Sequence, residues 1–348
     1  MILKGKWMIL LCLSLLLAGC SGAKPAAEPP AMAEQSDYIF GTLVSLKLYE
    51  PVEASVYQAV FDDLRDVENR MTVKGITSEL IAVNAAAGTA PVAVSADTFE
   101  VLEAAEKYAA LSEGAFDATV YPLVALWGIG TDLAQVPSPE EIEVTRQAVG
   151  YQDLVLDKAK GTAFLKRPGM GLDLGGIAKG YAADRTARKL KALGVDSGII
   201  NLGGNVLALG AKADGSPWRI GIQNPMSDRG EYLGIAAVTN KTVVTSGIYE
   251  RYFEQEGIRY HHILDPHTGY PSDNNLAGVS ILTDSSMDAD ALSTACFVLG
   301  PEKALALAKS LPGVEVLFIT KDKKVLMTEG FKAVFTQTDD SFTVVDAL

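Results

Sequence analysis

Hydrophobic and polar positions first form regular patterns near residue 38. The stretch YIFGTLVSLKLYE alternates apolar and polar side chains from Tyr38 onward and predicts a first strand. A helix follows, because four apolar residues recur three or four positions apart: Val56, Val60, Leu64 and Val67. A second helix is predicted over residues 97–114. A third begins where Ser138 and Glu141 form a capping box, and it ends near Gly150.

The second half of the chain is richer in short apolar runs. Residues 153–171 predict a hairpin, and LDL at 172–174 predicts a strand that passes through two glycines into a helix over residues 177–194. Short strands are predicted between residues 197 and 283, in the runs GIINLG, VLALG, WRIGI, LGIAAV, TVVTSG, RYFEQ, RYHHIL and GVSILT. Two helices over residues 286–312 separate these from three terminal strands, VEVLFIT, KKVLMT and KAVFT. Antiparallel strands with segregated helices favour an α+β fold of packed layers.

The N-terminus has the pattern of a targeting segment. Positive charge at Lys4 and Lys6 precedes an unbroken apolar run over residues 7–18, which is shorter than the roughly 20 residues of a membrane-spanning helix. The run ends in LAGCSG, which matches a bacterial lipobox with Cys20 as the lipidated residue. The alternative is an ordinary signal peptide with an incidental cysteine. Residues 1–20 therefore predict a lipoprotein signal peptide and an extracytoplasmic protein that is lipid-anchored to a bacterial membrane.

Composition adds a tether and excludes some partners. Residues 21–37 are rich in Ala and Pro without an apolar period, which predicts a flexible tether ahead of one folded domain at residues 38–348. Within that domain Cys296 is the single cysteine, so an intramolecular disulfide is excluded. The net charge is −13 and no block of Lys and Arg stands out, which argues against a nucleic-acid partner.

Two stretches carry groups suited to phosphate and metal chemistry. In LDLGGIAKGYAAD, a turn of two glycines before a helix offers free N–H groups to a phosphate, and Lys179 adds a positive charge; a purely structural turn is the alternative. In DSSMDADALSTA, a helix that begins at Asp290 places Ser293 and Thr294 one turn away, and these oxygens suit magnesium. The alternative is that Asp288 or Asp290 caps the helix.

All three histidines of the chain lie in HHILDPHTGYP. His261 and His262 are adjacent on a predicted strand and point to opposite faces, so at most one of the two can face a given site or metal ion. The residues DPHTGYP predict a turn, with Pro266 and Gly269 setting the backbone. A single inward-facing imidazole beside a cation site would suit a general base.

Together these motifs resemble the ApbE family, the FAD:protein FMN transferases, from about Phe40 to beyond Gly300. The resemblance rests on the following stretches in the family's order: FGT, SEL followed by Asn84, GAFDATVYPLVALWGIG, DLGGIAKGYAAD, NLGGN, TSGIYERYF, HILDPHTGYP and DADALSTACFVLG. The chain departs from the family at two positions, with Phe40 where Met is usual and Lys74 where Tyr is usual. Phenylalanine can still stack on a ring, whereas lysine suits phosphate or solvent.

The resemblance implies the ligands of each site. A divalent metal, usually magnesium, would be bound by the Gly176 carbonyl and by three residues of the second stretch: Asp290, Ser293 and Thr294. FAD would lie against a further set: Phe40, Ala115, Phe116, Asp117, Asp173, Lys179 and His262. His262 would also take the proton from the acceptor.

The activity implied is magnesium-dependent transfer of FMN from FAD to a Thr or Ser hydroxyl of an acceptor protein, with release of AMP. The acceptor would be a membrane redox-complex subunit or an extracytoplasmic flavoprotein. Two alternatives remain open at this point: a metal-dependent FAD pyrophosphatase, in which water replaces the acceptor, and a lipoprotein that binds FAD without chemistry. Metal ligands together with a base favour chemistry over simple binding.

Overall fold

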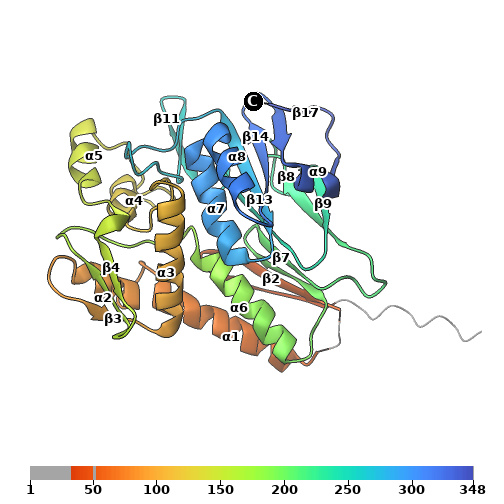
Figure 1. Ribbon diagram of the computed structural model, residues 1–348, viewed down its shortest axis with the longest axis horizontal. Coiled ribbons are helices and arrows are strands. Elements are labelled where there is room, and N and C mark those ends of the chain that lie inside the picture. The colour runs from red at the N-terminus through yellow and green to blue at the C-terminus, as the bar shows by residue number, and fades with distance from the viewer. Residues whose placement is uncertain (1–32, 50–51, 348) are drawn as a thin grey trace, which may run out of the picture.

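The fold is known from a computed structural model, which describes residues 33–49 and 52–347 (Figure 1). The predicted signal peptide, Cys20 and the first part of the tether lie outside these residues. The helices are α1 (Ala54–Met71), α2 (Glu79–Ala85), α3 (Ala96–Leu111), α4 (Tyr121–Trp127), α5 (Pro139–Arg146), α6 (Ala178–Ala192), α7 (Ser286–Leu299), α8 (Pro301–Ser310) and α9 (Glu329–Val334). None of them has the length and apolar character needed to span a bilayer, as far as the described ranges extend.

The strands form one large sheet and three small ones, which confirms the predicted α+β class. The large sheet has the order β1 (Ala33–Ile39), β2 (Thr42–Leu48), β6 (Gly198–Leu202), β7 (Asn205–Leu209), β10 (Thr242–Gly247), β13 (Leu276–Thr283), β14 (Glu315–Thr320), β15 (Lys324–Met327) and β17 (Thr343–Val344). The small sheets are β3 (Val92–Ala93) with β5 (Thr162–Leu165) and β4 (Leu154–Asp157), β16 (Phe335–Gln337) with β9 (Tyr232–Val238) and β8 (Trp218–Gln223), and β11 (Tyr252–Gln255) with β12 (Ile258–His261). The pairings between these strands are antiparallel except that of β15 with β17, and an isolated parallel bridge joins Val120 to Gly171.

The large sheet is covered on both faces, as the alternation along β14 shows. Val316 and Phe318 belong to the main core, which the helices α1, α6, α7 and α8 close on one side. Leu317 and Ile319 belong to a second core on the other side, closed by the β8–β9–β16 sheet and α9. Figure 1 shows α6 and α7 side by side over the sheet, with α3 and the β3–β5–β4 sheet next to them. Such two-sided burial explains why β13 is buried along its whole length.

The N-terminal strand prediction is wrong in two respects. The stretch from Tyr38 is not one strand, because Phe40 and Gly41 adopt φ of 56° and 66° and form the two-residue turn of a hairpin between β1 and β2. The first strand also begins at Ala33, inside the segment predicted to be a tether. Residues 33–37 pair with β2, which gives this polar stretch a place at the edge of the sheet.

Elsewhere the predicted elements are present, with errors at their ends, except the strand predicted at residues 172–174. The short strands predicted between residues 197 and 283 are confirmed, as is the capping box of Ser138 and Glu141. The predicted helices before Gly114 and Gly150 end three and four residues earlier than expected, at Leu111 and Arg146. The terminal run KAVFT is divided between α9 and β16, and the helices α2 and α4 were not predicted.

Candidate active site

The glycine turn before α6 is held from two sides by local hydrogen bonds. The prediction of a strand at residues 172–174 is wrong, because these residues do not pair with a neighbouring strand. Instead, the Asn84 amide donates to the Leu172 carbonyl at 3.0 Å and accepts the Leu172 N–H at 2.6 Å. Asp173 follows, and its carboxylate accepts the N–H of Gly175 at 2.6 Å. These contacts give an irregular segment one defined course into the helix.

A close contact between α6 and α7 places the turn against the second stretch. A Cβ on Gly180 would lie 2.2 Å from the Ser286 carbonyl oxygen and 2.6 Å from Met287 Cα, so only glycine permits this approach. One turn later Asp184 accepts hydrogen bonds from the N–H groups of Ser286 and Met287, at 2.8 and 3.0 Å. Burial raises the pKa of Asp184, while these donors oppose the effect. The two helices are therefore fixed relative to each other at the start of α7.

Asp290 lies inside α7 rather than at its start, since Ser285 is the N-cap and accepts the Asp288 N–H. The helix predicted from residue 286 is confirmed, so Asp290 does not begin it, and the alternative that an aspartate caps it is wrong. The spacing to Thr294 is unaffected. Asp290 Oδ2 accepts the Gly180 N–H at 2.9 Å, and Lys179 Nζ lies 3.3 and 3.4 Å from the two carboxylate oxygens.

Oxygen atoms from both segments converge at this point. Lys179 Nζ also donates to the Gly175 carbonyl at 2.8 Å, and Thr294 Oγ1 lies 3.3 Å from the position of a Cβ on Gly176. Because the Gly180 N–H is taken by Asp290, the Gly176 carbonyl receives no hydrogen bond from the described residues, and Thr294 Oγ1 makes none within them either. The Thr294 hydroxyl and the Gly176 carbonyl thus offer free oxygen atoms beside the Asp290 carboxylate, which Lys179 and the Gly180 N–H already contact, and such oxygen ligands suit a hard cation.

Ser293 does not share this environment. It is fully buried, its hydroxyl donates to the Asp290 carbonyl at 2.9 Å, and it pairs with the Ser246 hydroxyl of β10 at 2.8 Å. In the described part of the chain, no three His, Cys, Asp or Glu side chains group as metal ligands. Any metal held here would rely on one carboxylate, a hydroxyl and a carbonyl.

The three histidines occupy different environments, as the prediction of opposite faces requires. His261 is buried; its Nε2 lies 3.1 Å from the Ser272 carbonyl, and its Nδ1 accepts the Ile263 N–H at 3.3 Å. His262 is partly buried, and its Nδ1 lies 3.2 Å from the Arg251 carbonyl. Donation to that carbonyl leaves Nε2 as the proton acceptor of the ring. Burial, followed by the nearby Arg251 cation, lowers the pKa of His262 to about 3, so the ring is neutral at pH 7.

His267 anchors the predicted turn to residues 113 and 114, just before the segment 115–117. Its Nε2 lies 3.0 Å from the Glu113 carbonyl, and its Nδ1 lies 3.2 Å from the Asp265 carboxylate. The turn closes as expected, with Gly269 at φ of 79° and the Asp265 N–H bonded to the Tyr270 carbonyl.

The segment 115–117 supports the glycine turn. Ala115 and Phe116 are buried, and Phe116 Cε2 lies 3.3 Å from the position of a Cβ on Gly176. Both carboxylate oxygens of Asp117 are used within the fold, by the N–H groups of Thr119 at 2.7 Å and Tyr151 at 2.9 Å. Asp117, which the resemblance places against FAD, thus uses both carboxylate oxygens to order the loop around the site.

Phe40 and Lys74 lie near each other at the end of α1. Glu68 accepts a hydrogen bond from the Phe40 N–H and interacts electrostatically with Lys74, while burial raises its pKa. The two positions at which the chain departs from the family pattern therefore lie around the same residue, Glu68.

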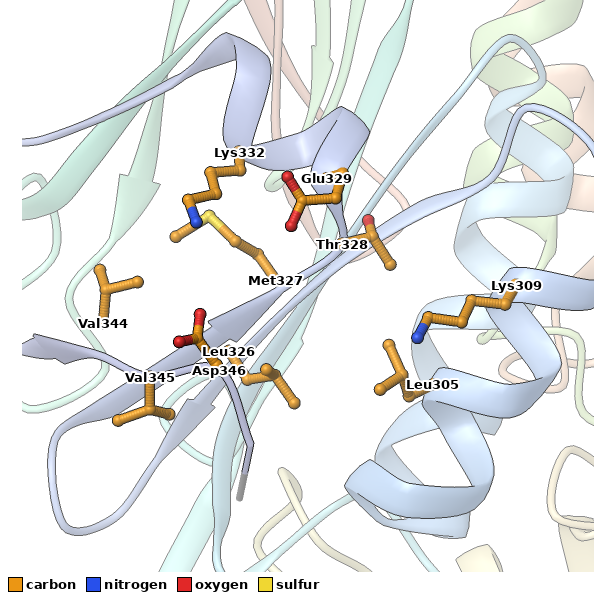
Figure 2. A pocket seen from close by; sticks show the side chains of 10 residues that line it. All are labelled: Leu305, Lys309, Leu326, Met327, Thr328, Glu329, Lys332, Val344, Val345 and Asp346. Atoms are coloured by element: carbon orange, nitrogen blue, oxygen red, sulfur yellow. The ribbon is translucent and has the colours of Figure 1, made fainter.

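A separate cavity lies elsewhere in the molecule. Figure 2 shows it beside α8, β15 and α9, lined by Leu305, Met327 and Lys332 among others. Its volume is about 170 Å³, and none of the predicted site residues lines it. Its lining places it outside the candidate active site.

The fold and the site define an α+β protein in which the glycine turn before α6, the Asp290 carboxylate and the Thr294 hydroxyl lie together. The sequence pattern of the ApbE family matches residues 40–318, and the chain belongs to that family. It is 38% identical over 311 residues to an FAD:protein FMN transferase of Klebsiella pneumoniae, covering 89% of this chain and 96% of that one. It is also 38% identical over 339 residues to an FAD:protein FMN transferase of Treponema pallidum, covering 92% of each chain.

Solved structures agree with the sequence comparison. The ApbE protein of Thermotoga maritima superposes with a TM-score of 0.82 at 32% identity, over 89% of this chain and 100% of that one. The flavin transferase ApbE of Vibrio cholerae superposes with a TM-score of 0.79 at 32% identity, over 88% and 100% of the two chains.

Proposed function

We propose that this protein is an FAD:protein FMN transferase. The observation that carries the proposal is the convergence of Lys179, Asp290 and Thr294 on the glycine turn, in a chain related over most of its length to proteins of that name. The Lys179 ammonium at this turn offers a positive charge to the pyrophosphate of FAD.

The side-chain and backbone oxygens at the turn fit a magnesium ion, because this ion prefers oxygen ligands and a single carboxylate contributes the negative charge. Asp290, Thr294 and the Gly176 carbonyl would hold it. When bound, the ion would supply positive charge to the phosphate oxygens of FAD. The predicted contribution of Ser293 is the weakest of the four, since its hydroxyl is already bonded to Ser246 and to the Asp290 carbonyl.

The chain's own residues account for the remaining steps. The acceptor hydroxyl attacks the flavin-side phosphorus, an O–P bond forms, and the P–O bond to AMP breaks. His262 Nε2 takes the hydroxyl proton, because Nδ1 faces the Arg251 carbonyl and leaves Nε2 as the proton acceptor of the ring. Lys179 would hold a phosphate oxygen. Phe40, Ala115, Phe116 and Asp173 would border the flavin nucleotide, whereas Asp117 acts mainly by ordering the loop.

The test is to incubate the purified full chain with FAD, Mg²⁺ and a candidate acceptor protein and to weigh the acceptor by mass spectrometry. Transfer predicts an acceptor heavier by FMN minus water, together with free AMP. Release of FMN and AMP with no change in the acceptor would show water as the nucleophile. FAD binding without AMP under any divalent metal would contradict an enzymatic role.

His262→Ala is expected to lower the transfer rate by about 100-fold or more while FAD still binds, because proton removal is lost. His267→Gln is the control, since it keeps an N–H for the Glu113 carbonyl and lies outside the predicted chemistry. Near-normal transfer by His262→Ala would rule out the role as base.

We also propose that the protein is lipid-anchored outside the cytoplasm through Cys20, where it would meet an extracytoplasmic or membrane-bound acceptor. The ordered succession of charge, apolar run and LAGC supports this. Cys20→Ala is expected to abolish incorporation of a labelled fatty acid in the native host. Unchanged labelling would contradict the anchor.

A further inference from the structure

Arg251 is tied by its backbone to the candidate base. It directly precedes β11, and its carbonyl oxygen accepts the His262 N–H at 3.1 Å and lies 3.2 Å from His262 Nδ1. The backbone of Arg251 therefore fixes the position of the His262 ring.

The side chain of Arg251 extends across two glycine turns. Its Nη2 lies 3.7 Å from the position of a Cβ on Gly41, and its Cδ lies 3.4 Å from that on Gly130. Gly41 is the tip of the β1–β2 hairpin next to Phe40, and Gly130 follows α4. The guanidinium thus lies where the hairpin tip, the loop after α4 and the segment before β11 meet.

Within residues 33–49 and 52–347 Arg251 has no carboxylate partner. Seven of the ten arginines in the chain form ion pairs among the described residues, whereas Arg251 forms none and its guanidinium makes no hydrogen bond there. The adjacent Glu250 is bonded to Arg229 at 2.7 Å. Lys179 and Arg251 both act electrostatically on His262. In a protein of net charge −13, two cations around one imidazole, one of them unpaired, make a place for an anion.

We propose that Arg251 is a substrate-binding residue that contacts the pyrophosphate of FAD together with Lys179. The proposal rests on the proposed function and deepens it by adding a residue to its substrate site. The planar guanidinium presents paired N–H donors that match two phosphate oxygens, which an ammonium group does not. Because the same residue fixes His262 through its carbonyl, the contact would align the phosphate with the base.

The experiment measures equilibrium binding of FAD and of riboflavin, which lacks phosphate, to the full chain and its variants. Arg251→Gln is expected to weaken FAD binding by about 10- to 100-fold and to change riboflavin binding by less than about twofold. Arg251→Lys is expected to lose about 3- to 10-fold for FAD. Arg219→Gln is the matched control, because Arg219 on β8 is exposed and also lacks an ion pair among the described residues.

An FAD affinity within about twofold of wild type in Arg251→Gln would overturn the proposal, and so would an equal loss for riboflavin, which would indicate a structural role. If Arg251→Gln does not fold, Arg251→Lys decides by the same two ligands. FMN transfer by the wild-type chain is measured in parallel. If the wild-type chain transfers FMN but FAD binding does not depend on Arg251, only this inference is overturned. If FAD binding depends on Arg251 but the wild-type chain transfers no FMN, only the proposed function is overturned.

Discussion

Gly180→Ala tests whether the contact between α6 and α7 positions the site. The added Cβ would lie 2.2 Å from the Ser286 carbonyl oxygen, whereas ordinary contacts begin at 3.4 Å, so the helices must separate by about 1.2 Å. Alanine favours the helix by about 1 kcal/mol over glycine, but overpacking against backbone costs about 1–3 kcal/mol. We therefore expect the free energy of unfolding to fall by up to about 2 kcal/mol.

The effect on activity is expected to be larger than the effect on stability. The Gly180 N–H holds Asp290 Oδ2 at 2.9 Å, so a separation of the helices moves the carboxylate away from the glycine turn. A displacement of about 1 Å in a reacting assembly can cost about 100-fold in rate. Urea unfolding gives the stability, and mass spectrometry of the acceptor gives the transfer rate.

Gly278→Ala in β13 is the control, because its Cβ would meet no atom closer than the flexible Ile319 Cδ1, at 3.4 Å, and the Ser246 carbonyl oxygen would lie 3.8 Å away. It is expected to retain the wild-type transfer rate. If Gly180→Ala transfers FMN within about twofold of wild type and unfolds at the same urea concentration, the contact does not position Asp290 and the reasoning fails.

Three further predictions concern single side chains. Asp290→Asn is expected to abolish the magnesium dependence and to lower the transfer rate by at least about 100-fold. Asp288→Asn in the same helix is the control and is expected to keep the wild-type transfer rate and magnesium dependence. Magnesium-stimulated turnover in Asp290→Asn would contradict the metal assignment. Phe40→Ala is expected to weaken FAD binding about 10-fold and Phe40→Met to restore most of it, measured by equilibrium titration; equal affinities for all three chains would exclude a ring contact. The pKa of buried His261 falls from 6.5 to about 4 on folding, mainly through burial. The unfolded chain therefore binds more protons, and about 3 kcal/mol of stability is lost as the pH falls from 6.5 to 4. Urea unfolding at several pH values checks this, and His261→Gln should remove about 3 kcal/mol of the dependence in that window, leaving the contribution of His262, whose pKa is also lowered.

Periodicity was sufficient for much of the fold because most elements are short and bounded by turn residues. The strands from β6 to β13 follow runs of β-branched and apolar side chains separated by glycines and polar turns. The ends of helices were less predictable. The helix before Gly114 ends at Leu111, since Glu113 and Gly114 both take positive φ and need their own turn.

The wrong predictions arise where tertiary contacts override the local pattern. Phe40 at positive φ is an unusual turn residue, and Gly41 alone did not signal a hairpin. Residues 172–174 look like a strand, but the Asn84 side chain takes the place of a neighbouring strand there.

For the site, spacing within one helix was predictable and contacts between segments were not. The interval from Asp290 to Thr294 follows from the helical period. The bond between Asp290 and the Gly180 N–H joins residues 110 positions apart, and no local pattern reports it. The same limit applies to Arg251, whose neighbours Gly41 and Gly130 come from distant parts of the chain.

The most direct test of the account is a crystal of the protein grown with FAD and Mn²⁺ and measured for anomalous scattering at the manganese edge. The account predicts a peak within about 2.5 Å of an Asp290 carboxylate oxygen, the Thr294 hydroxyl and the Gly176 carbonyl, with a phosphate of FAD beside it. A metal peak bound by other residues, or FAD bound with its phosphates away from the glycine turn, would contradict it.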